Sequence, residues 1–133
     1  YPEVRSWMDR VIEETKHAGY VETFFKRRRS IPGIYERNKN LYEEACRIAI
    51  NTKIQGTAAE LMKVGMLRVD KALKNGHYDA EILLQIHDEI LVSVAQKDTL
   101  VVQKLIEKEL SEVVSWNVVL KVESSSGTNW KEV

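Results

Sequence analysis

The chain has 133 residues, the size of one domain, and its 44% hydrophobic content suits a globular protein with a modest core. Its 20 basic and 20 acidic side chains give a formal net charge of zero, so any nucleic-acid-binding surface must be local. The single cysteine, Cys46, excludes an intrachain disulfide, and the sequence contains neither a membrane-length apolar run nor a signal-peptide pattern. We therefore expect a soluble cytoplasmic protein with no membrane partner.

The first predicted element is a helix that begins at Pro2 and ends before Gly19. Proline suits the first helical position, and glycine is common directly after a helix. Apolar side chains recur at the spacing of one buried helix face, at Val4, Trp7, Met8, Val11 and Ile12. A helix that starts this abruptly suggests a piece of a longer chain.

Residues 20–31 are predicted to form a strand, a tight turn and a second strand, because Tyr20, Val21 and Phe24 are good strand formers. The turn leads into the most basic run of the chain, residues 26–29 (KRRR). Such a run is usually a solvated surface, and the alternative is a contact with phosphate groups.

A long helix is predicted next, capped by Asn38 or Asn40 and running to about residue 73 or 74. Its middle, residues 51–57, is rich in weak helix formers, so we expect a bend or break there.

Three polar side chains, Arg47, Asn51 and Gln55, recur every four residues in this helix and so lie roughly above one another. They form either an ordinary exposed polar face or a row of hydrogen-bond donors. The minor groove of a DNA duplex offers acceptors at every base pair, so a donor row suits binding without sequence preference.

Two aliphatic runs, each long enough for a buried strand, meet at His87, Asp88 and Glu89. Favoured two-residue hairpin turns need positive φ and usually contain glycine, which is absent here, so these residues are poorly explained as turn formers alone. Two adjacent carboxylates at a hairpin tip form an oxygen-rich site suited to Mg²⁺, and the alternative is a solvated turn.

The remaining chain is predicted to form an amphipathic helix opened by Lys97 or Asp98, a last strand over residues 118–123, and a loop over residues 124–127. The predicted fold class is α+β, a small antiparallel sheet that carries the His87–Asp88–Glu89 tip and has helices across its other face.

Several runs resemble family A DNA polymerases of the bacterial DNA polymerase I type. Residues 85–89 (QIHDE) are similar to the C-terminal palm motif of that family, and residues 47–59 resemble its helical primer–template motif. Residues 19–23 with Arg27 and Arg28, and residues 127–130 (GTNW), are also similar. The resemblance covers nearly the whole chain, with the elements in family order.

The resemblance implies that residues 1–36 are the base of the fingers, a helix plus a basic hairpin, and that residues 37–133 are the C-terminal part of the palm. Three positions depart from the usual family residues. Lys26 stands where relatives usually have glycine, which leaves the turn type open. Cys46 stands where they often have glutamate, and Lys53 where they often have proline.

The resemblance also implies template-directed DNA synthesis, in replication and repair, by two Mg²⁺ ions about 3.5–4 Å apart that act on the primer 3′-hydroxyl and the leaving pyrophosphate. Asp88 corresponds to one invariant metal ligand, Glu89 to a carboxylate that assists the metal site, and His87 to a contact with the primer end. Arg47, Asn51 and Gln55 correspond to minor-groove donors, and Arg27 and Arg28 to phosphate contacts.

The second invariant aspartate and the nucleotide-gripping helix of such enzymes lie upstream of anything in this chain. The expected partners are therefore primer–template DNA, a dNTP and the missing N-terminal part of the polymerase domain. We expect the isolated chain to hold half of the active site, to be inactive and to self-associate. A bacterial nucleoid location is implied, and a phage or organellar origin stays open.

Two other functions fit parts of the sequence. A phosphohydrolase of the HD type uses an adjacent His-Asp pair, with His17 and His77 as further ligands, but such sites are usually helical. A non-catalytic duplex-binding module would use the basic turn and the polar stripe alone.

Overall fold

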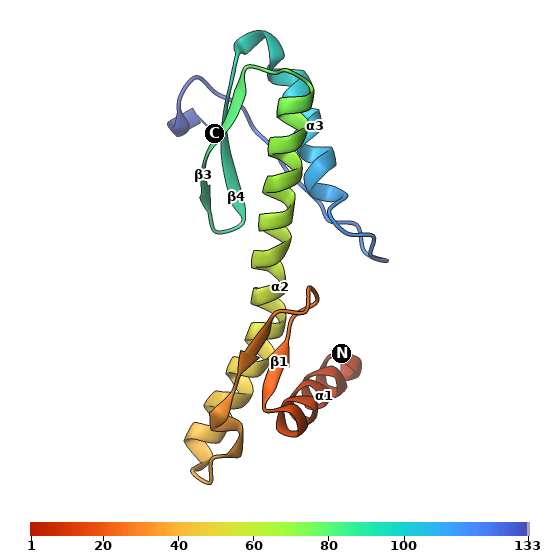
Figure 1. Ribbon diagram of the computed structural model, residues 1–133, viewed down its shortest axis with the longest axis vertical. Coiled ribbons are helices and arrows are strands. Elements are labelled where there is room, and N and C mark those ends of the chain that lie inside the picture. The colour runs from red at the N-terminus through yellow and green to blue at the C-terminus, as the bar shows by residue number, and fades with distance from the viewer. Residues whose placement is uncertain (133) are drawn as a thin grey trace. The chain divides into compact units, whose positions relative to one another are not determined.

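The computed structural model describes residues 1–132 and consists of helices and short antiparallel strands (Figure 1). In chain order its elements are α1 (Pro2–Ala18), β1 (Tyr20–Glu22), β2 (Arg28–Ser30), η1 (Pro32–Tyr35), α2 (Lys39–Asn75), β3 (Ala80–Ile86), β4 (Glu89–Val94), η2 (Gln96–Asp98), α3 (Thr99–Ser111) and η3 (Trp130–Glu132). The strands form two two-stranded antiparallel sheets, β1–β2 and β3–β4. The predicted α+β class is confirmed.

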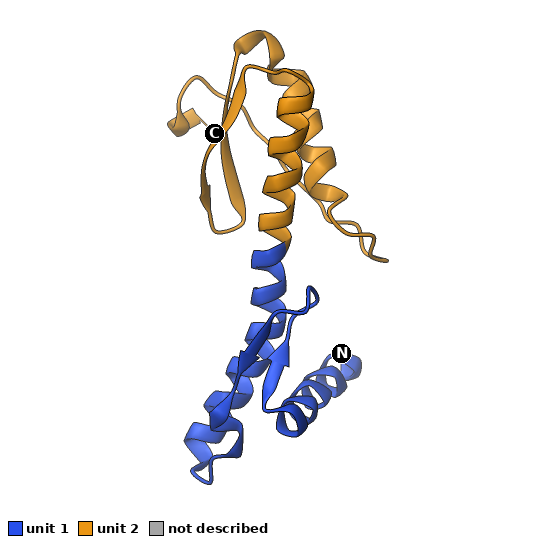
Figure 2. Cartoon of the chain, in the orientation of Figure 1, with its two compact units in different colours: residues 1–60 blue, residues 61–133 orange. Residues whose placement is uncertain are grey.

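The chain divides into two compact units, unit 1 (residues 1–60) and unit 2 (residues 61–133), each with its own hydrophobic core (Figure 2). This division by packing falls within α2. The resemblance predicts a different kind of division, into the base of the fingers (residues 1–36) and the C-terminal part of the palm (residues 37–133). That division stays a prediction. Residue 133 lies outside the described residues.

Unit 1 has a core that α1, the β1–β2 hairpin, η1 and the first part of α2 build together. Helix α1 ends as predicted, because Gly19 adopts a φ of 77° and its N–H donates to the Thr15 carbonyl oxygen at 2.8 Å. The two strands pair with Val21 opposite Arg29. The buried side chains are Val11, Val21, Ile31, Ile34, Ala45, Cys46 and Ala49.

Helix α2 is continuous over 37 residues, so the break expected within residues 51–57 is absent. Its start is capped as predicted, since the Asn38 Oδ1 atom accepts a hydrogen bond from the Asn40 N–H at 2.9 Å. Tertiary packing overrides the low helix propensity. Gly56 faces the β1–β2 loop so closely that a Cβ atom there would lie 2.9 Å from the Thr23 methyl group. The Thr57 hydroxyl donates to the Lys53 carbonyl, four residues earlier in the same helix, at 2.6 Å.

Unit 2 packs the β3–β4 hairpin against the second part of α2 and against α3. Its buried side chains are Val69 and Leu73 from α2 and Val102 from α3. Half-buried apolar side chains of both strands, helix α3 and the residues before β3 cover them: Tyr78, Ala80, Ile82, Ile90, Val92, Val94, Leu105, Ile106 and Leu110. The hairpin register shifts between Ile82 and Leu84, where the half-exposed Leu83 is left out of the ladder.

The strand predicted over residues 118–123 is not formed, and this expectation was wrong. The segment pairs with no strand in residues 1–132, and Val118 and Val119 are 74% and 83% exposed. Strand-forming residues need a neighbouring strand to satisfy their backbone groups, and the ladder ends at β4. The loop predicted for residues 124–127 is confirmed. No helix within residues 1–132 is both long and apolar enough to cross a membrane.

The core of unit 2 supplies a matched stability test on α3. Val102 is 1% exposed and its neighbour Val101 is 53% exposed. We expect Val102→Ala to lower the free energy of unfolding by about 2 kcal/mol, because it removes buried methyl groups and leaves a cavity. Val101→Ala should change it by less than about 0.5 kcal/mol. Urea denaturation of the two variants measures the difference, and equal effects would contradict the burial of Val102.

Candidate functional site

The basic hairpin of unit 1 has a three-residue loop, Phe24 to Lys26. The Lys26 N–H donates to the Thr23 carbonyl at 3.1 Å, and the Thr23 N–H donates to the Arg27 carbonyl at 2.9 Å, which extends the ladder by one pair. Lys26 has a φ of 72°, the left-handed conformation that such loops need at their third position. This geometry resolves the turn type and explains why glycine would suit position 26.

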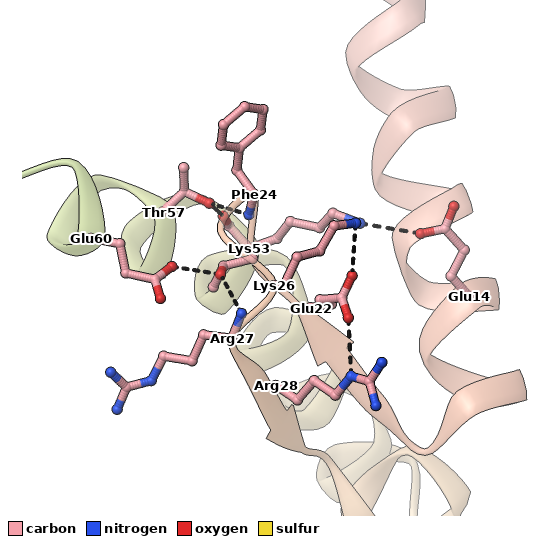
Figure 3. A network of polar contacts seen from close by, with 10 residues as sticks. Glu14, Glu22, Phe24, Lys26, Arg27, Arg28, Lys53, Thr57 and Glu60 are labelled. Atoms are coloured by element: carbon pink, nitrogen blue, oxygen red, sulfur yellow. Dashed lines mark hydrogen bonds and ion pairs between the residues drawn. The ribbon is translucent and has the colours of Figure 1, made fainter. Parts of the chain in front are cut away.

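A bridging carboxylate organises the basic run (Figure 3). Glu22, directly opposite Arg28 in the β1–β2 register, accepts a hydrogen bond from Arg28 Nε at 3.0 Å and another from Lys26 Nζ at 3.1 Å. The hydrogen bond from Arg28 lowers the pKa of Glu22, and that from Lys26 lowers it further. The Arg28 guanidinium carbon also lies 4.7 Å from the centre of the Tyr20 ring.

The other two arginines of the run are placed differently. Arg29 donates to the Thr52 hydroxyl at 3.1 Å. The Arg27 side chain is exposed, points away from the Glu22 network in Figure 3, and forms no ion pair within residues 1–132. Arg27 and Arg28, the predicted phosphate contacts, therefore lie in one hairpin, with Arg28 held by Glu22 and Tyr20 and Arg27 extended away from them.

The hairpin loop is docked on α2 by polar contacts that are partly buried or exposed (Figure 3). Thr23, only 4% exposed, donates its hydroxyl hydrogen to Glu60 Oε2 at 2.5 Å and accepts from the Arg27 N–H at 3.1 Å. The Phe24 N–H donates to the Thr57 hydroxyl at 3.1 Å. Sequence reasoning missed the supporting residues Glu22, Thr23 and Glu60. For Glu22, the hairpin pattern held a usable signal, because closing the loop at Thr23 pairs Glu22 with Arg28.

The predicted donor stripe of Arg47, Asn51 and Gln55 lies on α2 within unit 1. All three side chains are exposed, and none of them forms a hydrogen bond or ion pair with another of the described residues. By helical periodicity the stripe lies away from Ala45 and Ala49, which are 3% and 0% exposed in the core. The stripe therefore presents free donors to solvent, as a groove-binding surface requires.

The acidic tip lies at the end of the β3–β4 hairpin in unit 2. Ile86 pairs with Glu89, so the turn consists of His87 and Asp88 alone. His87 supplies the positive φ, 53°, and its carbonyl oxygen accepts a hydrogen bond from Gln85 Nε2 at 2.9 Å. These residues form the turn without glycine, at the hairpin tip where the sequence analysis placed them. His87, Asp88 and Glu89 are all exposed.

The tip suits a divalent metal chemically but supplies only part of a ligand set. Asp88 and Glu89 offer carboxylate oxygens, which Mg²⁺ prefers. Within residues 1–132, however, no three His, Cys, Asp or Glu side chains are close enough together to hold a metal ion. His77 therefore forms no metal-binding group of the HD type with His87 and Asp88, and the histidine–aspartate pair lies in a strand hairpin rather than on a helix.

Comparison with known proteins gives consistent matches. The model of the family described as DNA polymerase family A matches residues 1–132. The chain is 41% identical over 132 residues to DNA polymerase I of Streptococcus pneumoniae and 38% identical over 132 residues to the thermostable DNA polymerase I of Thermus filiformis. These alignments cover 99% of this chain but only 15% and 16% of the two relatives.

A solved structure agrees with these matches. The chain superposes with a TM-score of 0.87 and 33% identity on the POL domain of Pol1 from M. smegmatis, described as a complex with DNA primer–template and dNTP. The match covers 91% of this chain and 21% of that one. With the family model matched along residues 1–132, this chain belongs to DNA polymerase family A.

Proposed function

We propose that the chain acts in template-directed DNA synthesis, as the base of the fingers (residues 1–36) and the C-terminal part of the palm (residues 37–133) of a DNA polymerase. The observation that carries the proposal is the exposed pair of carboxylates, Asp88 and Glu89, at the tip of the β3–β4 hairpin of a family A chain. The solved neighbour, with its primer–template and dNTP, supports DNA and a deoxynucleotide as partners.

Asp88 would hold Mg²⁺ through its carboxylate, and Glu89, the next residue, would orient or assist that site. When bound, a pair of such ions activates the primer 3′-hydroxyl and stabilises the leaving pyrophosphate. His87 would contact the primer end. Its carbonyl oxygen accepts a hydrogen bond from the Gln85 side chain, which supports the turn that would carry this contact.

Unit 1 would hold the duplex through two sets of side chains, the donor stripe and the basic hairpin. Arg47, Asn51 and Gln55 would donate to purine N3 and pyrimidine O2 atoms, which every base pair presents in the minor groove. Arg27 and Arg28 would bind backbone phosphates, which fix position without reading sequence. This combination suits an enzyme that must accept any template.

The 133 residues span about 15% of the length of the polymerase I relatives, and the remaining catalytic groups would come from the rest of the polymerase domain. By itself the chain would bind duplex DNA weakly and would not catalyse synthesis. Its exposed apolar side chains, including Val118, Val119 and Leu100, would favour self-association in isolation. In the cell the whole enzyme would act in replication and repair on bacterial chromosomal DNA, in the cytoplasm.

The role of Asp88 predicts the effect of Asp88→Asn in the full-length polymerase. The substitution keeps the size of the side chain but removes its charge, so turnover should fall at least about 100-fold. The affinity for duplex DNA should change little. Primer extension and duplex-binding assays measure the two quantities.

Two controls accompany this test. Glu81→Gln removes an exposed carboxylate from the same hairpin, away from the tip, and should leave turnover near the unsubstituted level. The unsubstituted 133-residue chain should give no primer extension. Near-normal turnover of Asp88→Asn would rule out the metal-ligand role.

The donor stripe predicts a loss of affinity that does not depend on sequence. Alanine at Arg47, Asn51 or Gln55 should weaken duplex binding about 5-fold, the equivalent of one hydrogen bond of about 1 kcal/mol, on all template sequences alike. Fluorescence anisotropy with several duplexes measures this. Lys63→Ala, which removes an exposed basic side chain of α2 outside the stripe, is the control. A loss confined to particular base pairs would contradict the groove contact.

Arg28, as a phosphate contact, predicts a different signature. Arg28→Ala should reduce the slope of log affinity against log salt concentration by about one unit, because one fewer counterion is released. Titrations at four or five salt concentrations measure the slope. Arg5→Ala, which removes an exposed arginine of α1 paired with Asp9, should leave the slope unchanged.

A further inference from the structure

Arg28 is unusual among the basic residues of the hairpin because two different groups hold its guanidinium. Glu22 accepts from Nε at 3.0 Å, and the guanidinium carbon lies 4.7 Å from the centre of the Tyr20 ring. The side chain is nevertheless 64% exposed. An arginine this exposed would otherwise sample many rotamers, so the two contacts restrict a side chain that burial does not restrict.

The hydrogen bond to Glu22 uses only one of the three guanidinium nitrogens. Within residues 1–132 the two terminal nitrogens of Arg28 donate to no side chain. A guanidinium whose terminal N–H groups are free and whose orientation is fixed matches the bidentate geometry in which arginine binds phosphate oxygens.

We propose that Glu22, together with the Tyr20 ring, is a positioning residue that presents Arg28 to a phosphate of the DNA backbone. The inference rests on the proposed phosphate contact of Arg28 and adds to it the residues that prepare that contact. Binding then immobilises a side chain that is already ordered, which reduces the entropic penalty of the contact.

The negative charge of Glu22 would by itself repel a phosphate bound to Arg28. Lys26 offsets this repulsion, because its ammonium group binds the other carboxylate oxygen of Glu22 at 3.1 Å. One carboxylate thus bridges two cations, and the three side chains together keep a net positive charge. The Glu22 side chain is also only 25% exposed, which holds the carboxylate against the strand and leaves the guanidinium outermost.

The test compares variants of the full-length polymerase in duplex binding at several salt concentrations. Glu22→Ala should weaken binding about 5-fold, whereas Glu22→Gln, whose amide oxygen still accepts from Arg28 Nε, should bind nearly as well as the unsubstituted enzyme. Both variants keep Arg28, so the salt slope should stay the same. In the Arg28→Ala background, Glu22→Ala should produce no further loss.

A second pair of variants, at Tyr20, tests the positioning of Arg28 while Glu22 is left unsubstituted. Tyr20→Phe keeps the ring under the guanidinium and should bind normally, and Tyr20→Leu should weaken binding. Thermal unfolding of every variant checks that the hairpin is intact. If Glu22→Ala fails to fold, the comparison of Glu22→Gln with the Tyr20 variants still decides the proposal.

Three outcomes would overturn the inference. Tighter binding by both Glu22 variants would mean that the carboxylate competes with phosphate. An equal loss from Glu22→Ala with and without Arg28 would mean that Glu22 acts through the fold. An unchanged affinity and slope in Arg28→Ala would refute the phosphate contact itself, so failure of the proposed function is distinguishable from failure of the positioning role.

Discussion

The docking of the β1–β2 loop on α2 is the contact on which the functional surface of unit 1 depends. Thr23 is buried between the hairpin and Gly56, and its hydroxyl group joins Glu60 to the Arg27 backbone. Any side chain at position 56 would collide with the Thr23 methyl group. A glycine that weakens the helix locally is therefore what allows the hairpin to approach, and this approach keeps the basic run at a fixed place beside α2.

The placement of the hairpin has an electrostatic consequence. Four consecutive basic residues would repel one another if left alone, and the structure separates their roles. Glu22 bridges Lys26 and Arg28, Thr52 holds Arg29, and Arg27 extends into solvent. Individual exposed ion pairs contribute little to stability, so the value of this arrangement lies in orientation. A protein of zero formal net charge thereby acquires a local cationic surface suited to a polyanion.

The acidic tip of the β3–β4 hairpin, His87 to Glu89, differs from the basic hairpin because it needs further ligands to bind its metal ion. Asp88 and Glu89 are exposed, and within residues 1–132 no third His, Cys, Asp or Glu side chain completes a metal-binding group with them. Such a tip needs additional carboxylates and substrate phosphates to hold Mg²⁺ well, because Mg²⁺ is bound through few protein ligands and loses its water reluctantly. The positive φ of His87 is a modest strain that the paired strands on either side support, and it fixes the direction of the adjacent carboxylate.

Features that depend on local chemistry could be predicted from the amino-acid sequence: the helix between Pro2 and Gly19, both hairpins, and the family motif around Asp88. The continuity of α2, the absence of a strand at residues 118–123, and the docking of Thr23 on Glu60 depended on tertiary structure. The two groups of features differ in how far apart along the chain the interacting residues lie. Thr23 and Glu60 are 37 residues apart in the sequence. Local helix and strand propensities do not predict contacts between residues at that separation.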